Sequence, residues 1–194
     1  MLSNKRNGEY NSRSIRSFLC LPLEAPEKEL LLSCMKAPGV RWLSEDQLHI
    51  TLHFLGDIAP EILENLDEIL RKAPLDRGSI NLSFSSWGTF PPGSRGRVLW
   101  VGLGGEVPKL AKLYRQLEKI LFQCGISVEK RSYTPHITLA RAFREGSISR
   151  EARESLEKAP FYGRSWEAKR FVLMRSELLP QGPRYSPLGI YDLS

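Results

Sequence analysis

The sequence predicts an α+β protein built from two related lobes. Segments with helical and with strand periodicity alternate along the 194 residues, and they fall into two comparable sets. Each set contains one copy of the phrase His-Ile-Thr-Leu, at residues 49–52 and again at 136–139. The simplest explanation of this repeat is that the protein contains two copies of one half-structure.

The first part of the chain predicts two strands and one helix. Alternating residues over 15–23 predict a strand, and a helix is expected over 24–36, where a Pro-Gly pair stops it. The first motif strand is expected at about 47–55, closed by residues 56–57, which are Gly and Asp.

The next segment predicts a helix and two more strands. Pro60 begins a helix with Leu and Ile at helical spacing, and Pro74 ends it. Alternation at 80–84 predicts a strand, and the apolar segment 98–103 predicts another after a Pro-rich loop.

A long helix and the second motif strand follow. One apolar stripe runs from about residue 107 to 124, and Gly125 caps this helix. A strand is expected near 127–130 and the second motif strand at 136–141.

The end of the chain predicts a short helix and a hairpin. Ser149 can cap a helix that continues through residue 158. Alternation over 167–177, a turn at 180–183 and a return over 184–191 predict the closing strands.

The two motif copies present the same chemical groups. In a strand, a side-chain period of two places His49 and Thr51 on one face, and likewise His136 and Thr138, while Ile and Leu face the core. A single copy is more simply read as a structural histidine in a strand. Two copies use two of the three histidines in the chain, which favours a shared site.

Two imidazoles and two hydroxyls suit a phosphate group. Imidazole can take and give a proton near neutral pH, and a Thr hydroxyl can donate to a phosphoryl oxygen. With one imidazole on each side of a phosphorus atom, one can deprotonate a water and the other can protonate the departing oxygen. This pattern predicts phosphodiester chemistry that needs no metal.

Composition and charge limit the partners and the cellular location that we expect for this protein. The net charge is +6, and the excess lies in residues 98–194, which suits a polyanion such as RNA, although a solvated basic surface would look the same. No apolar run could span a bilayer, and residues 1–13 are expected to form a flexible polar arm without a secretory signal. We therefore expect a cytoplasmic protein. The three cysteines lack metal-ligand spacing and are expected to be free thiols.

Five ordered stretches carry a family resemblance. They are 16–19, 40–42 with 47–56, 90–91 with 97–100, 135–141, and 184–188. Together they resemble the two-histidine (2H) phosphoesterase superfamily, and within it the RNA 2',3'-cyclic phosphodiesterase branch, also called the 2'-5' RNA ligase family. The resemblance covers nearly the whole chain after the arm.

The resemblance implies a fold and an activity. The implied fold is a single bilobal phosphoesterase domain over residues 14–194, with antiparallel sheets and outer helices around a central cleft that holds both His-x-Thr pairs. The implied reaction is metal-independent hydrolysis of RNA 2',3'-cyclic phosphate ends to 2'-phosphomonoesters, without a cofactor. Family members also join or cleave 2'-5' linkages in tRNA halves. A monomer is expected.

The resemblance also assigns residue roles. His49 and His136 become the acid/base pair, with His136 as the base and His49 as the acid, or the reverse. Thr51 and Thr138 hold the nonbridging oxygens, and Arg141 neutralises phosphate. Strict alternation places Arg141 on the face opposite His136, so this role needs the strand to end or to bulge before Arg141. Otherwise Arg141 is a solvent-facing strand end.

Further positions could contact substrate. By the same alternation, His53 shares a face with the first motif histidine, at the cleft rim or in solvent, and Phe54 should be core. Phe18, Trp42 and Tyr133 could stack a base, although aromatic residues near strands are more often core.

Two other functions fit the same residues. One is a phosphodiesterase for a small cyclic phosphodiester, such as a cyclic nucleotide or an ADP-ribose cyclic phosphate. The other is an RNA-binding module without catalysis, which would not need paired proton-transfer groups.

Overall fold

Helices and strands alternate through the computed structural model, which describes residues 14–75, 78–128, 132–144, 146–157 and 159–193. The elements are β1 (Ile15–Pro22), α1 (Ala25–Cys34), β2 (Arg41–Trp42), the 3-10 helix η1 (Glu45–Gln47), β3 (His49–Ile58), α2 (Pro60–Lys72), β4 (Ile80–Phe90), β5 (Val98–Gly105), α3 (Val107–Gln123), β6 (His136–Arg141), α4 (Arg150–Glu157), β7 (Ser165–Ala168), β8 (Arg170–Leu179) and β9 (Gly182–Asp192). The predicted α+β class is confirmed.

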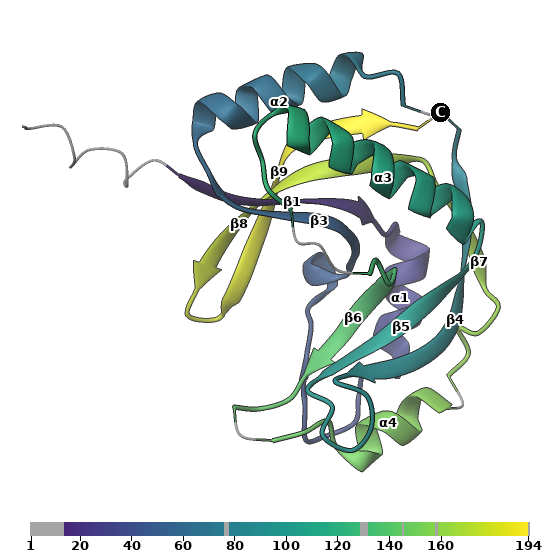
Figure 1. The fold of residues 1–194 in the computed structure, drawn as a ribbon. Helices are drawn as coiled ribbons and strands as arrows, with labels where there is room; N and C mark the ends of the chain where they lie inside the picture. Colours follow the sequence, from purple (N-terminus) through teal and green to yellow (C-terminus); the bar gives the residue numbers. More distant parts are fainter. Residues whose placement is uncertain (1–13, 76–77, 129–131, 145, 158, 194) are drawn as a thin grey trace, which may run out of the picture.

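The strands of the described residues join one curled antiparallel sheet (Figure 1). Its order is β7-β4-β5-β6-β3-β1-β8-β9, and β2 pairs with the free part of β6. We call β1, β3, β8 and β9 the first lobe, and β2 with β4 to β7 the second lobe. The two motif strands are therefore neighbours at the boundary between the lobes.

The lobes meet through equivalent residues of the two motifs. In the described residues, β3 and β6 pair only at Ile50 and Ile137, the second residue of each copy. Both side chains are fully buried. Because antiparallel pairing at one point is locally two-fold symmetric, this bridge relates the two motif copies to each other.

The lobes are not the two halves of the chain. The C-terminal strands β8 and β9 extend the sheet beside β1, so the first lobe combines both ends of the chain. Helices α2 and α3 lie side by side over the first lobe, and α4 lies at the second (Figure 1). The loop after α1 reaches α4, because Ser149 donates a hydrogen bond from Oγ to the Pro38 carbonyl at 2.8 Å.

The amphipathic helices bury the stripes that the sequence predicts. Leu63, Leu66 and Leu70 of α2 are buried, as are five apolar residues of α3. They join one core cluster with the inward faces of the strands. Within the described residues, no helix is long and apolar enough to cross a membrane.

Most element boundaries agree with the sequence, and two do not. Strand β3 does not end at Gly56 but continues to Ile58 through a bulge, where Gly56 has a φ of +78° that favours glycine. No strand forms over 126–128, and the rest of the strand expected near 127–130 lies outside the described residues. The predicted cap of α4 is confirmed, since the Ala152 N–H donates to Ser149 Oγ. The predicted arm, 1–13, lies outside the described residues.

Candidate active site

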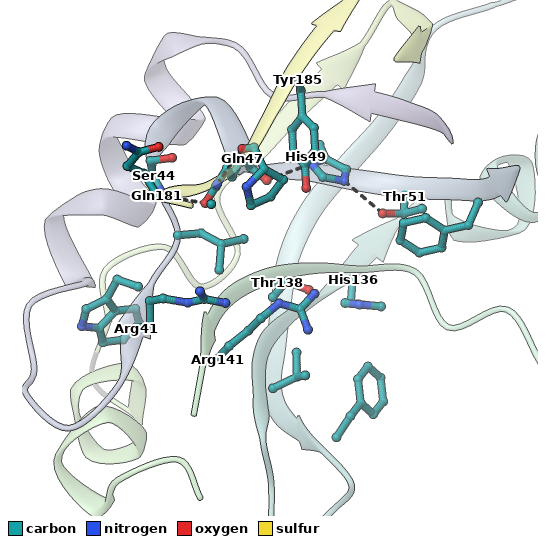
Figure 2. A pocket seen from close by; sticks show the side chains of 17 residues that line it. Arg41, Ser44, Gln47, His49, Thr51, His136, Thr138, Arg141, Gln181 and Tyr185 are labelled. Atoms are coloured by element: carbon teal, nitrogen blue, oxygen red, sulfur yellow. Dashed lines mark hydrogen bonds between the residues drawn. The ribbon is translucent and has the colours of Figure 1, made fainter. Parts of the chain in front are cut away.

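A cleft of about 540 Å³ opens where the lobes diverge from the β3–β6 bridge. His49 and Thr51 lie on its first-lobe wall, and His136 and Thr138 lie on the second-lobe wall (Figure 2). The antiparallel register about the bridge sets each histidine opposite the threonine of the other strand. The fold thus brings all four motif side chains to one cavity.

The two imidazoles are anchored in the same way. His49 Nδ1 lies 2.8 Å from the carbonyl of Gln47, and His136 Nδ1 lies 2.7 Å from the carbonyl of Thr134. A carbonyl oxygen only accepts, so Nδ1 carries the proton in both rings and Nε2 is left for the cleft. In His49 this Nε2 accepts from Thr51 Oγ1 at 3.1 Å.

Aromatic rings pack against both histidines. Phe18 and Tyr185 lie 4.9 and 5.5 Å from the His49 ring, and Phe90 lies 5.1 Å from the His136 ring, between centroids. This apolar packing fixes the rings and removes water from them. It therefore disfavours the imidazolium form of each.

The pKa values of both histidines are lowered. Burial lowers the pKa of His49 to about 4, with a smaller lowering from the charge of His136, against the opposing effect of the Gln47 carbonyl. Burial also lowers the pKa of His136, and the nearby Arg141 guanidinium lowers it further. In the absence of an anion, both rings are thus neutral at pH 7.

The motif strands contain the same β-bulge at the same place. On β3, Thr51 pairs with Cys20 and the next paired residue is His53, so Leu52 is skipped. On β6, Thr138 pairs with Trp100 and the next paired residue is Ala140, so the residue after Thr138 is skipped as well. Each bulge reverses the alternation of faces beyond it.

The bulge on β6 turns Arg141 toward the site. Arg141 lines the cleft together with Thr138, on the face that unbroken alternation would deny it (Figure 2). It pairs with Arg41 of β2, and the side chains of both point into the same end of the cleft. Arg41 was not among the predicted site residues, because its approach depends on the pairing of β2 with β6.

The bulge on β3 reverses two expectations. Phe54 is not core: it is 64% exposed and lines the cleft. His53 is not at the rim or in solvent: it is 2% exposed, donates from Nε2 to the Tyr114 carbonyl at 2.9 Å and stacks on the Tyr114 ring. The alternation of side-chain faces does not continue through the bulge, and the sequence of one strand does not reveal where the bulge lies.

The three aromatic residues considered for stacking occupy different settings. Phe18 is buried beneath His49. Trp42 lines the cleft while its indole N–H donates to the Ala37 carbonyl. Tyr133 is partly buried and donates to the Thr51 carbonyl. Two further aromatic residues line the cleft, exposed Phe54 on the first-lobe wall and half-buried Phe90 on the second-lobe wall, and the sequence did not single them out for this role.

The chain matches known proteins over most of its length. A sequence profile of the 2'-5' RNA ligase superfamily matches residues 24–178. The chain is 32% identical to the RNA 2',3'-cyclic phosphodiesterase of Aeropyrum pernix over 149 residues, which is 77% of this chain and 84% of that protein. It is 30% identical to that of Methanocaldococcus jannaschii over 175 residues, or 88% and 96% of the two chains.

A solved structure shows the same architecture. The crystal structure of Escherichia coli LigT in its apo form aligns with a TM-score of 0.75 and 26% identity, covering 94% of this chain and 99% of that one. The fold is therefore the bilobal two-histidine phosphoesterase fold that the resemblance implied. The chain belongs to the 2'-5' RNA ligase superfamily.

Proposed function

We propose that this protein hydrolyses RNA 2',3'-cyclic phosphate ends to 2'-phosphomonoesters, with His49 and His136 as the acid/base pair. The observation that carries the proposal is the pair of imidazoles anchored through Nδ1, whose Nε2 atoms serve one cleft from its two walls. Such an arrangement allows one ring to accept a proton while the other donates one.

The proposed step is an in-line displacement at phosphorus. His136 Nε2 takes a proton from a water whose oxygen forms the new bond to phosphorus. The bond from phosphorus to the ribose 3' oxygen breaks, and His49 donates its Nε2 proton to that oxygen. Because the pKa of His49 is lowered more strongly, the single proton of the free pair lies on His136, so this direction of transfer requires the proton to reach His49 once substrate is bound. With the roles exchanged, His136 is the acid and His49 is the base.

The remaining cleft residues would hold the phosphate. Thr51 and Thr138 hydroxyls donate to the nonbridging oxygens, and the Arg141 guanidinium neutralises their charge. A bound phosphate anion also raises the pKa of both imidazoles, so substrate supplies the conditions for one ring to carry a proton.

The aromatic rings on the two walls support a nucleotide rather than a bare phosphate as the substrate. Phe54 and Phe90 line the cleft beside the proposed phosphate position, and bases stack favourably on such rings. Relatives named RNA 2',3'-cyclic phosphodiesterase support RNA as the substrate class.

The proposal extends to the partners and to the reverse chemistry. A ribose hydroxyl in place of water would form a 2'-5' linkage, so tRNA halves are proposed as substrates for joining. We also propose that residues 14–194 form one catalytic domain that acts as a monomer, since both histidine half-sites of the cleft come from the same chain.

The decisive assay uses an oligoribonucleotide with a 2',3'-cyclic phosphate end in the presence of a chelator. We expect the wild type to release only the 2'-phosphomonoester. His49→Ala and His136→Ala should each lower kcat by about a thousandfold, the range of general acid/base catalysis. Unchanged circular dichroism spectra would show that both variants fold.

Three outcomes would contradict the proposal. Full activity in either histidine variant would remove the paired roles, and loss of activity with the chelator would require a metal. Faster turnover of a cyclic mononucleotide or of an ADP-ribose cyclic phosphate than of RNA would identify a small-molecule phosphodiesterase instead.

A further inference from the structure

Arginines on the two lobes differ in their partners. On the first lobe, Arg16 pairs with Asp57, and both Arg175 and Arg184 pair with Glu177. Asp57 offsets the charge of Arg16, and Glu177 offsets one of the two charges of Arg175 and Arg184.

The second lobe carries arginines without such partners beside the cleft. We call this set the arginine rim. It consists of Arg41, Arg95, Arg97, Arg141 and Arg144. All are exposed, and none forms an ion pair with a carboxylate among the residues that the structure describes. Only Arg141 and Arg144 belong to the basic second half of the chain, and the fold brings Arg41, Arg95 and Arg97 to them from the first half.

The arginine rim is continuous with the candidate active site. Arg41 pairs with Arg141, and Arg141 also pairs with Val98, so these three residues lie side by side across β2, β6 and β5. Arg97 directly precedes Val98 and donates to the carbonyl of Arg144 at 2.7 Å. The rim therefore leads from the cleft onto the two loops at the end of the second lobe.

These two loops are held together by the backbone. The Ala142 N–H donates to the Arg97 carbonyl, and the Ile148 N–H donates to the Gly96 carbonyl. Arg95 lies on the first of these loops and Arg144 on the second, and the structure gives neither side chain a hydrogen bond or an ion pair within the described residues. Positive charge is thus displayed on a fixed backbone.

We infer that the arginine rim binds the phosphates of the RNA strand upstream of its cyclic end. This inference rests on the proposed function, which places the terminal phosphate at Arg141. An RNA strand that leaves the cleft over the second lobe would pass close to several guanidinium groups that have no carboxylate partner. Each phosphate neutralised in this way releases counterions and contributes about −0.7 to the salt slope for a single strand.

The test compares two substrates with the same 3' end. One is a dinucleotide with a 2',3'-cyclic phosphate, and the other is a single-stranded RNA of about twelve nucleotides with the same terminal dinucleotide. The variant is Arg95→Ala/Arg144→Ala, which spares Arg97 because its side chain bonds to the neighbouring loop. The control is Arg115→Ala/Lys119→Ala, which removes two exposed charges from α3 on the other lobe.

We expect the wild type to prefer the long RNA at low salt. In the rim variant, the ratio of kcat/KM for long over short RNA should fall roughly tenfold, and the salt slope for the long RNA should flatten by about 1.4. The control variant should keep the wild-type ratio and slope. Equal use of both lengths by the wild type, or the same loss in rim and control variants, would overturn the inference.

A binding measurement separates this inference from the proposed function. If the wild type hydrolyses neither substrate, the proposed function fails. Fluorescence anisotropy with the long RNA ending in a 2'-phosphate then tests the rim directly, and the rim variant should bind it roughly tenfold more weakly than the control. Equal binding by the two variants, or equally effective competition by duplex DNA, would reject a single-stranded RNA path.

Discussion

Strands β3 and β6 carry the same motif and the same bulge, but they differ in the two residues that follow. His53 and Phe54 occupy on β3 the positions of Ala140 and Arg141 on β6. The backbone is duplicated, so both imidazoles reach the cleft in the same way. The side chains after the bulge are not duplicated, so this position carries a cation on one wall and an aromatic ring on the other.

This difference teaches how a symmetric scaffold can bind an asymmetric substrate. Proton transfer needs two similar groups on opposite sides of a phosphorus atom, and the repeat supplies them. A nucleotide has an anionic phosphate and an aromatic base, and the positions after the bulges supply one partner for each. We expect the orientation of substrate to be set by Phe54 and Arg141, and the chemistry by the histidines.

The sharpest test of the comparison removes and then relocates the cation. Arg141→Gln should lower kcat/KM about a hundredfold, because a charged donor to the phosphate is lost. Adding Phe54→Arg to this variant should restore part of the loss if the cleft accepts a cation from either wall. Steady-state kinetics on the cyclic dinucleotide measures both, with Arg115→Gln on α3 as the control. A loss in the control as large as in Arg141→Gln would show a general charge effect.

The pH dependence tests the unequal burial of the two rings. The free protein is active when the pair holds one proton, which requires a pH between the two pKa values. That of His49 is about 4, and that of His136 lies below its ordinary 6.5. We expect kcat/KM to rise as pH increases through about 4 and to fall about tenfold per unit above pH 6.5, as the last proton is lost. A profile that stays level up to pH 8 would contradict the lowered pKa values.

Replacing the threonines tests whether the half-sites contribute equally. Thr51→Val and Thr138→Val should each lower kcat about tenfold, since each removes one hydrogen bond to a charged oxygen. Thr51→Val should also shift the acidic limb of the pH profile, because only Thr51 has a hydrogen bond to its histidine in the structure described. Serine at either position should retain most activity. A tenfold loss in one valine variant and none in the other would break the equivalence.

The smallest effect on activity is expected from the third histidine. His53→Ala removes the hydrogen bond and the stacking to Tyr114, at a cost of about 1–3 kcal/mol in folding free energy. Thermal melting should therefore show a Tm lower by roughly 3–10 °C. Activity per folded molecule should stay close to that of the wild type. A loss comparable to that of His49→Ala would place His53 in the chemistry.

Local patterns predicted the elements and the motif residues well. The helices begin and end near the expected prolines and glycines, because these residues act on the backbone at their own position. The two His-x-Thr faces followed from the period of a strand, and Thr51 and Thr138 do line one cleft.

The face of the sheet that a side chain occupies beyond a bulge cannot be predicted from the sequence of one strand. A bulge is defined by the register against the neighbouring strand, and Leu52 is skipped only because Cys20 and Leu19 pair with the residues on its two sides. The predictions for His53 and Phe54 were wrong for this reason. The role proposed for Arg141 needed a bulge of the same kind in β6. Nothing in the sequence of that strand predicts where a bulge forms.

The amino-acid sequence by itself determined the alternation of helices and strands, the duplicated histidine strands and the uneven distribution of charge. These depend on residues close together in the chain. Tertiary structure decided the bridge between Ile50 and Ile137, the addition of β8 and β9 to the first lobe, and the approach of Arg41 to Arg141. Each of these depends on pairing between segments far apart in the chain, and local periodicity carries no information about such partners.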